Sequence, residues 1–176
     1  MPAGQVTLNS GRITMSSELV LLLTFGIGLV AGLRTMTAPA VVAWAAHFGW
    51  INLSGSRLAF MASVWAVTLF TIGALVEYVV DQLPSTPPRT SDRGLTARMV
   101  TGSLTGACLG IAGGASPWLG APIAIIGAIA GAFGGYQARV RLVHGLRVRD
   151  AVIAIPEDLL AIGLGLLLVS RFVSRL

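Results

Sequence analysis

The sequence predicts an all-α fold, a polytopic helical membrane protein with about six membrane segments. Its 176 residues are 55% hydrophobic and only 11% charged, and the mean hydropathy is +0.82, which is far from the balance of a soluble domain. All twelve basic residues are arginines, and they lie between or beside the apolar stretches instead of clustering. The basic charge therefore indicates membrane topology and argues against a nucleic-acid partner.

The chain begins with a polar stretch, and we expect residues 1–16 to form a disordered leader, with Met15 as an alternative start. The first apolar segment is predicted over 17–33 and is followed by Arg34. This arginine argues against a cleaved signal peptide, because such a peptide would stay uncharged up to its small-residue cleavage site. The second segment, 37–50, is short, so a full crossing and a dip into the membrane both stay open.

The remaining segments follow from the spacing of the charges. Forty consecutive uncharged residues separate Arg98 from Arg139, which is enough for two crossings at about 20 residues each. Pro117 marks the turn between them, since proline cannot donate a backbone hydrogen bond inside a helix. The predicted segments after the second are 57–83, 95–114, 118–139 and 150–172.

A proline-rich linker, 84–94, divides this single membrane domain, 17–176, into the halves 17–83 and 95–172. With three segments in each half, the halves enter the membrane from opposite sides, which is the arrangement of a 3+3 inverted repeat. The six-segment topology places eight of the twelve arginines on one side. We predict that side to be cytoplasmic and both termini to lie on the other.

Small residues recur at spacing four, which puts them on one face of a helix. We expect two such glycine ridges to pack against each other as a close hairpin: Gly102, Gly106 and Gly110 with Gly127, Gly131 and Gly135. A similar ridge in the first segment comprises Thr24, Gly28 and Gly32. A glycine-lined path and a homodimer seam are the alternatives to helix packing alone.

Two carboxylates, Glu77 and Asp81, lie four residues apart on one face at the end of the third segment. That is the unfavourable end of a helix for a negative charge, and Glu77 lies roughly 9 Å inside it at 1.5 Å per residue. A carboxylate at that depth needs a partner, a proton or water. The alternative is a side chain that reaches the cytoplasmic interface.

The step Pro156-Glu157-Asp158 resembles a helix start, because proline is favoured at the first position of a helix and acids in its first turn. Residues 151–155 are already apolar, however, which would put this start below the membrane surface. Glu157 would then lie about as deep as Glu77, and four carboxylates could gather on one face of the bundle.

Arg34 is the candidate centre of this site. Burying it together with Glu77 or Glu157 costs far less than burying one charge alone, so we predict one of these two as its counter-ion. Thr35 and Thr37 begin the second segment, whose free N–H groups could hold an anion beside Arg34. An arginine in a hairpin could instead extend to lipid phosphates.

The predicted ligand or ion pathway comprises Arg34, Glu77, Asp81, Glu157 and Asp158, with Arg139 and Arg141 as candidate ion-pair partners. The two histidines and the single cysteine lack the spacing of metal ligands, and the serines lie in no nucleophile motif. We therefore expect neither an enzyme nor a bound metal or other cofactor.

Three stretches resemble an uncharacterised bacterial integral-membrane family that is known only as a domain of unknown function. They are G-L-R-x4-P at 32–39, E-x3-D-x-L-P-x2-P at 77–87 and P-E-D at 156–158. The resemblance spans about residues 17–172 and implies a compact multi-pass protein of a bacterial inner or plasma membrane. It brings no established activity with it.

The charges predict a transporter or channel for a proton, an ion or a small solute. One rival is a non-transporting structural or accessory protein, in which the same charges form a packing network. A second rival is an anionic-lipid binder that acts through the arginine-rich loop 139–149. The partners we expect are the lipid bilayer, a second copy in a homodimer, and a small ion or solute.

Overall fold

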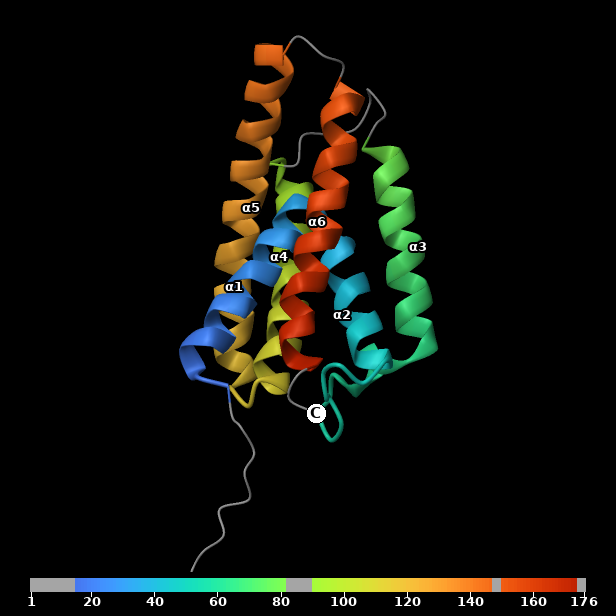
Figure 1. The fold of residues 1–176 in the computed structure, drawn as a ribbon, viewed down its shortest axis with the longest axis vertical. Helices are drawn as coiled ribbons and strands as arrows, with labels where there is room; N and C mark the ends of the chain where they lie inside the picture. The colour runs from blue at the N-terminus through green and yellow to red at the C-terminus, as the bar shows by residue number, and fades with distance from the viewer. Residues whose placement is uncertain (1–14, 82–89, 147–149, 174–176) are drawn as a thin grey trace, which may run out of the picture.

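The computed structural model describes residues 15–81, 90–146 and 150–173 (Figure 1). The predictions on residues 1–14 and on most of the linker lie outside these ranges. Within them the fold is all-helical, with six α-helices, one short 3-10 helix and no strand. The elements are α1 (Ser17–Leu33), α2 (Thr37–His47), η1 (Ala59–Ala62), α3 (Val64–Val80), α4 (Asp92–Ala112), α5 (Pro117–Leu146) and α6 (Asp150–Val173).

Consecutive α-helices run in alternating directions, so α1 begins and α6 ends at the same end of the bundle (Figure 1). Serine caps start three of these helices. The side chains of Ser16, Ser63 and Ser91 each accept a hydrogen bond from a backbone N–H in the first turn of α1, α3 and α4. Such caps satisfy one of the backbone donors that a helix start leaves without an intrahelical partner.

The longest helix, α5, is the element on which α1 and α4 pack. It has 30 residues, roughly 45 Å at 1.5 Å per residue. A Cβ added to Gly28 or Gly32 of α1 would overlap the backbone carbonyls of Ala124 and Ala128 in α5. A Cβ on Gly106 of α4 would overlap the Ala124 side chain as well. The backbones of these three helices therefore touch.

The two predicted glycine ridges do not face each other. The α4 ridge contacts α5 around Gly120 and Ala124, whereas Gly127 and Gly131, further along α5, contact α1. The contacts of α4 and α1 therefore lie on overlapping stretches of α5, with α4 reaching back to Gly120 and α1 reaching on to Ala132. The spacing of glycines identifies a face for close packing but carries no information about which helix occupies it.

The ridges of the two halves are similar because they share this packing partner. In an inverted repeat, α2 would be the counterpart of α5, but α2 has 11 residues and α5 has 30. The two halves are therefore not equivalent in the structure, although each contains three helices in alternating directions.

In segment 37–50, for which a full crossing and a dip into the membrane were both open, the helix α2 is short. Eleven residues extend roughly 16 Å, about half of a 30 Å hydrocarbon layer. Gly32, at the end of α1, faces Ala128 and Ala132 near the middle of α5, which continues to Leu146. The turn between α1 and α2 therefore lies inside the bundle, about halfway along α5.

Two predicted boundaries are wrong. The third helix begins at Val64, not at 57, because η1 and a turn precede it. The fifth runs to Leu146 through most of the predicted loop 139–149, since no helix breaker interrupts it before Gly145.

The local helix-start pattern at Pro156 does not begin a helix, whereas the predicted segment 150–172 agrees with α6 (Asp150–Val173). Pro156 lies inside α6, which begins at Asp150. The residues just before the proline are apolar, and Ala154 is completely buried. The proline removes one backbone hydrogen bond from α6, and the flanking Val152 and Ile155 are 53% and 57% exposed.

Two helical stretches are long and apolar enough to cross a membrane, judged by length and composition: Pro117–Leu146 and Val152–Val173. α1 and α3 are shorter apolar helices of 17 residues each. α3 packs on α2 and η1 and exposes large apolar side chains on its other faces. These include Trp65, Leu69, Ile72, Val76 and Val79.

Candidate functional site

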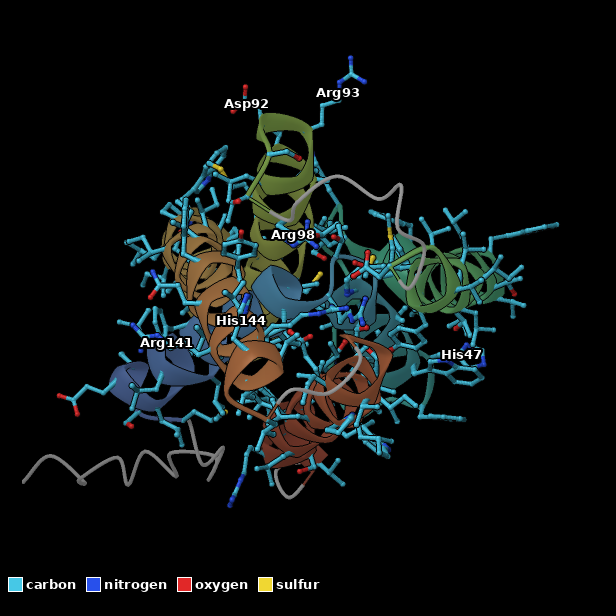
Figure 2. The ribbon with its side chains drawn as sticks, turned by 90° about the horizontal axis from the view of Figure 1, so that it is seen from above. His47, Asp92, Arg93, Arg98, Arg141 and His144 are labelled. Carbon is cyan, nitrogen blue, oxygen red and sulfur yellow. The ribbon has the colours of Figure 1, made fainter. Side chains whose placement is uncertain are left out.

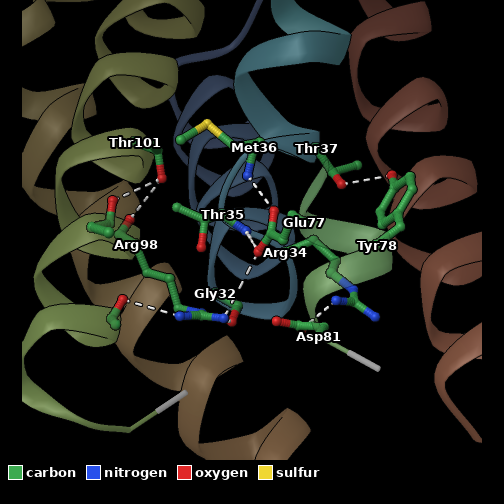
Figure 3. Close-up of polar contacts among 12 residues, drawn as sticks. Gly32, Arg34, Thr35, Met36, Thr37, Glu77, Tyr78, Asp81, Arg98 and Thr101 are labelled. Carbon is green, nitrogen blue, oxygen red and sulfur yellow. Dashed lines mark hydrogen bonds and ion pairs between the residues drawn. The ribbon is translucent and has the colours of Figure 1, made fainter. Parts of the chain in front are cut away.

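Arg34 lies at the turn between α1 and α2 and is completely buried. Its Nη1 donates to the Asp81 carboxylate at the end of α3, and its Nε lies 2.5 Å from the Asp158 carboxylate of α6. Figure 3 shows the guanidinium beside Asp81 and Tyr78, with Cζ 5.5 Å from the centroid of the Tyr78 ring. One buried cation therefore connects three segments that are far apart in sequence.

The third nitrogen of the guanidinium, Nη2, is buried and has no hydrogen-bond partner among the described residues. A buried donor in this state costs on the order of 1–3 kcal/mol, and more when it is charged. Nη2 of Arg34 is therefore available to a water molecule or to an oxygen atom of a ligand.

Glu77 holds the start of α2 from a different helix. Its Oε1 accepts a hydrogen bond from the backbone N–H of Thr35 at 2.7 Å, and its Oε2 accepts one from that of Met36 at 2.8 Å (Figure 3). Met36 is the N-cap of α2 and has no side-chain capping bond. The chain's own Glu77 carboxylate thus occupies two N–H groups at the helix start around Thr35 and Thr37, and binding of an external anion there stays a prediction.

Thr37 faces the other side of the α2 start. Its hydroxyl lies 2.8 Å from the hydroxyl of Tyr78, one residue after Glu77 (Figure 3). Glu77, Tyr78 and Asp81 therefore attach the last turn and a half of α3 to the α1–α2 turn.

Arg98 is a second buried arginine, with only 5% of its surface exposed. Its Nε donates to the backbone oxygen of Gly32 at 3.0 Å and its Nη1 to that of Gly94 at 3.0 Å, while Nη2 lies 3.9 Å from Glu77. Arg98 thus satisfies a carbonyl at the end of α1. Figure 2 shows it among the helices, whereas Arg93 points outward.

Arg98 is not among the predicted site residues. The predicted segment 95–114 nevertheless places this arginine inside a helix and not between helices. That position was the available signal for a buried cation.

Glu157 pairs with Arg139 across α5 and α6, with Nη1 and Oε2 3.5 Å apart. Both side chains line an apolar groove of about 250 Å³ between these helices, together with Leu33. The other predicted partner, Arg141, is exposed and makes no ion pair with the residues that the structure describes.

The predicted counter-ions of Arg34, Glu77 or Glu157, are wrong, although each lies on the same helix as an actual counter-ion. Asp81 and Asp158 contact Arg34, and not Glu77 or Glu157. Asp81 lies one turn beyond Glu77 on the same face, and Asp158 is rotated about 100° from Glu157 around α6. Each helix therefore directs one acid to Arg34 and the other to a different partner.

The structure brings together all four predicted carboxylates with three arginines. We call this set the ionic cluster: Arg34, Glu77, Asp81, Arg98, Arg139, Glu157 and Asp158.

Residues 21–171 match the profile of a family described as a domain of unknown function, DUF4126. The chain belongs to this family. The DUF4126 match begins in α1 and ends in α6, so it includes every residue of the ionic cluster. The resemblance to an uncharacterised family is therefore confirmed. No curated protein and no solved structure matches the chain.

The DUF4126 cluster offers limited chemistry. Among the described residues, no group of three or more histidine, cysteine, aspartate or glutamate side chains could hold a metal ion. Carboxylates can exchange protons, and a buried guanidinium can hold an oxygen ligand without changing its own charge. The arrangement is suited to binding and releasing protons or small ligands beside a fixed cation.

Proposed function

We propose that the chain is a multi-pass protein of an inner or plasma membrane that moves a proton, an ion or a small solute past Arg34, Asp81 and Asp158. The observation that carries this proposal is the complete burial of Arg34 between two carboxylates from α3 and α6. Removing these charges from water costs several kcal/mol per ion, and well-packed apolar residues are often at least as stable. A buried network of this kind points to a function beyond stability.

The surface of the bundle supports a location in the bilayer. Two helices have the length and composition of membrane spans, and α1 and α3 are apolar over 17 residues each. Trp65 and Trp118 are 85% and 84% exposed, and large exposed apolar side chains are favoured where the solvent is lipid.

The way in which α3 is attached to the bundle supports a movement of this helix relative to α6. This helix packs on α2 and η1, and near its end the contacts with Arg34, Thr35 and Met36 are polar. Protonation of Asp81 or Asp158 removes one charge pair from Arg34 and weakens the connection between α3 and α6. Proton binding could thus be coupled to separation of these two helices.

Reconstitution in liposomes tests the proposal. With a pH dye inside the vesicles and a panel of tracer ions and solutes outside, we expect flux for the unaltered protein. Asp81→Asn and Asp158→Asn should abolish it, because each removes an acid that contacts Arg34. Asp92→Asn makes the same change at an exposed position (Figure 2) and should retain flux.

Flux no greater than that of Asp81→Asn across the whole panel would reject transport. The alternative is a structural or accessory protein, and the contacts of Glu77 favour it, since they stabilise a helix start without leaving an oxygen unused. In that case the same substitutions would lower thermal stability in detergent while every flux stayed at background.

A further inference from the structure

An apolar groove of about 330 Å³ lies between α2, α3 and α6. This volume lies at the lower end of the range of small-molecule sites, which is about 300–1,000 Å³. Its walls are mainly aliphatic and aromatic, and its polar lining residues are two threonines and one tyrosine. The aromatic residues are Trp44, Phe48, Trp50 and Tyr78, and the threonines are Thr37 and Thr71.

Two of the three polar residues that line the groove, Thr37 and Tyr78, lie where it approaches the ionic cluster. Thr71 already accepts a hydrogen bond from the Trp44 indole at 3.1 Å. Thr37 and Tyr78 place their hydroxyls 2.8 Å apart, and the Tyr78 ring separates them from Arg34, whose Nη2 is a buried donor without a hydrogen-bond partner. The groove therefore has a long apolar part and one end with a pair of hydrogen-bonded hydroxyl groups.

We propose that this groove binds an uncharged amphiphile, with its hydrocarbon chain along α2, α3 and α6 and a carbonyl oxygen of its head at Thr37 and Tyr78. A carbonyl fits because it accepts hydrogen bonds and needs no acceptor.

The charges near the groove argue for a neutral head. Arg34 already contacts two carboxylates, Asp81 and Asp158, so an incoming anion would gain no unmatched positive charge from it and would meet two negative ones. An uncharged carbonyl accepts a hydrogen bond at Thr37 and Tyr78 without that repulsion. Esters and quinones with long chains belong to this class.

The groove is open to ligands that arrive through lipid. Leu75 and Leu166, on α3 and α6, line it and are 58% and 43% exposed. An apolar molecule dissolved in the bilayer can enter between these helices without crossing water. The inference thus rests on the membrane location in the proposed function. Binding is measured without any flux, so a negative transport result does not contradict it.

Tryptophan fluorescence provides the test. Trp44 and Trp50 line the groove, so Trp65→Phe and Trp118→Phe leave only these two as reporters. The protein is placed in phosphatidylcholine vesicles and titrated with three dibrominated C18 probes: the methyl ester of stearic acid, the free acid and the alkane. Bromine quenches tryptophan on contact. We expect saturable quenching by the ester at a concentration roughly 3–10-fold below that of the alkane, as one or two hydrogen bonds would give.

Matched variants locate the binding. Leu166→Phe narrows the groove and should weaken quenching by the ester, whereas Leu167→Phe, at a neighbouring residue outside the groove that is 52% exposed, should leave it unchanged. Thr37→Val should remove much of the advantage of the ester over the alkane. Linear quenching that is equal in both leucine variants would overturn the proposal, and so would a free acid that binds more tightly than the ester.

Discussion

Glu77 belongs to α3, yet it completes the first turn of α2. Most helix caps come from the residue that precedes the helix, but the side chain of Met36 makes no capping hydrogen bond to the start of α2. The two oxygens of Glu77 take the N–H groups of Thr35 and Met36 instead. The carboxylate also lies at the positive end of the α2 dipole, a favourable place for a negative charge. A tertiary contact therefore replaces a local signal that the sequence lacks.

Glu77→Gln should destabilise the fold by about 1–3 kcal/mol, because the amide keeps one acceptor and turns an N–H₂ group toward the other backbone donor. Thermal unfolding in detergent measures the change. Glu18→Gln, at an exposed site in the first turn of α1, is the control. Equal melting temperatures for the two variants would contradict the capping role.

The sequence predicts the residues of the site better than their pairs. Arg34 stands out because it is a single charge between two apolar segments, and the sequence predicts its partners among the acids at the same depth. Which acid it contacts depends on rotations of about 100° per residue and on how α3 and α6 are turned in the bundle. Those rotations result from packing between distant segments, which one sequence does not specify.

At the scale of the elements, the order and number of helices follow from the charges and the apolar stretches. The contacts between helices do not. Gly127 and Gly131 predict a close approach, and the structure shows α1 where α4 was expected. The extension of α5 through 139–146 likewise depends on ordinary helix propensity in a stretch whose arginines suggested a loop.

Gly28→Ala should destabilise the protein by about 1–3 kcal/mol, since the added methyl group would overlap the Ala124 carbonyl and force α1 away from α5. Gly134→Ala is the matched change on a free face of α5, where an added Cβ meets nothing within 4 Å. It should be neutral or stabilising by up to about 1 kcal/mol, because alanine favours the helix. Chemical or thermal unfolding in detergent compares the two, and equal effects would reject close packing at Gly28.

At the scale of the molecule, alternating helix directions place the loop between α2 and α3 at one end of the bundle and the end of α5 at the other (Figure 1). If the bundle spans a membrane, these two regions face opposite compartments. Ser54 and His144 are exposed representatives of each.

Single cysteines test this arrangement in sealed vesicles. The native Cys108 is completely buried and should not react with a membrane-impermeant maleimide. The variants Ser54→Cys and His144→Cys should be labelled from opposite sides, and the thiol of the His144→Cys variant should be protected where the arginine-rich side is inside. Labelling of both variants from one side would contradict a transmembrane bundle.

The position of Arg34 sets an order on assembly. Asp81 is synthesised 47 residues after it, and Asp158 comes only with the last helix. At about 5–20 residues per second, a ribosome needs roughly 10 s to make the intervening chain. If the bundle spans a membrane, the guanidinium stays hydrated or at the headgroups during that interval, and the hairpin of α1 and α2 reaches its final depth only after α6 has been made. In that case the last helix completes the burial of the first turn.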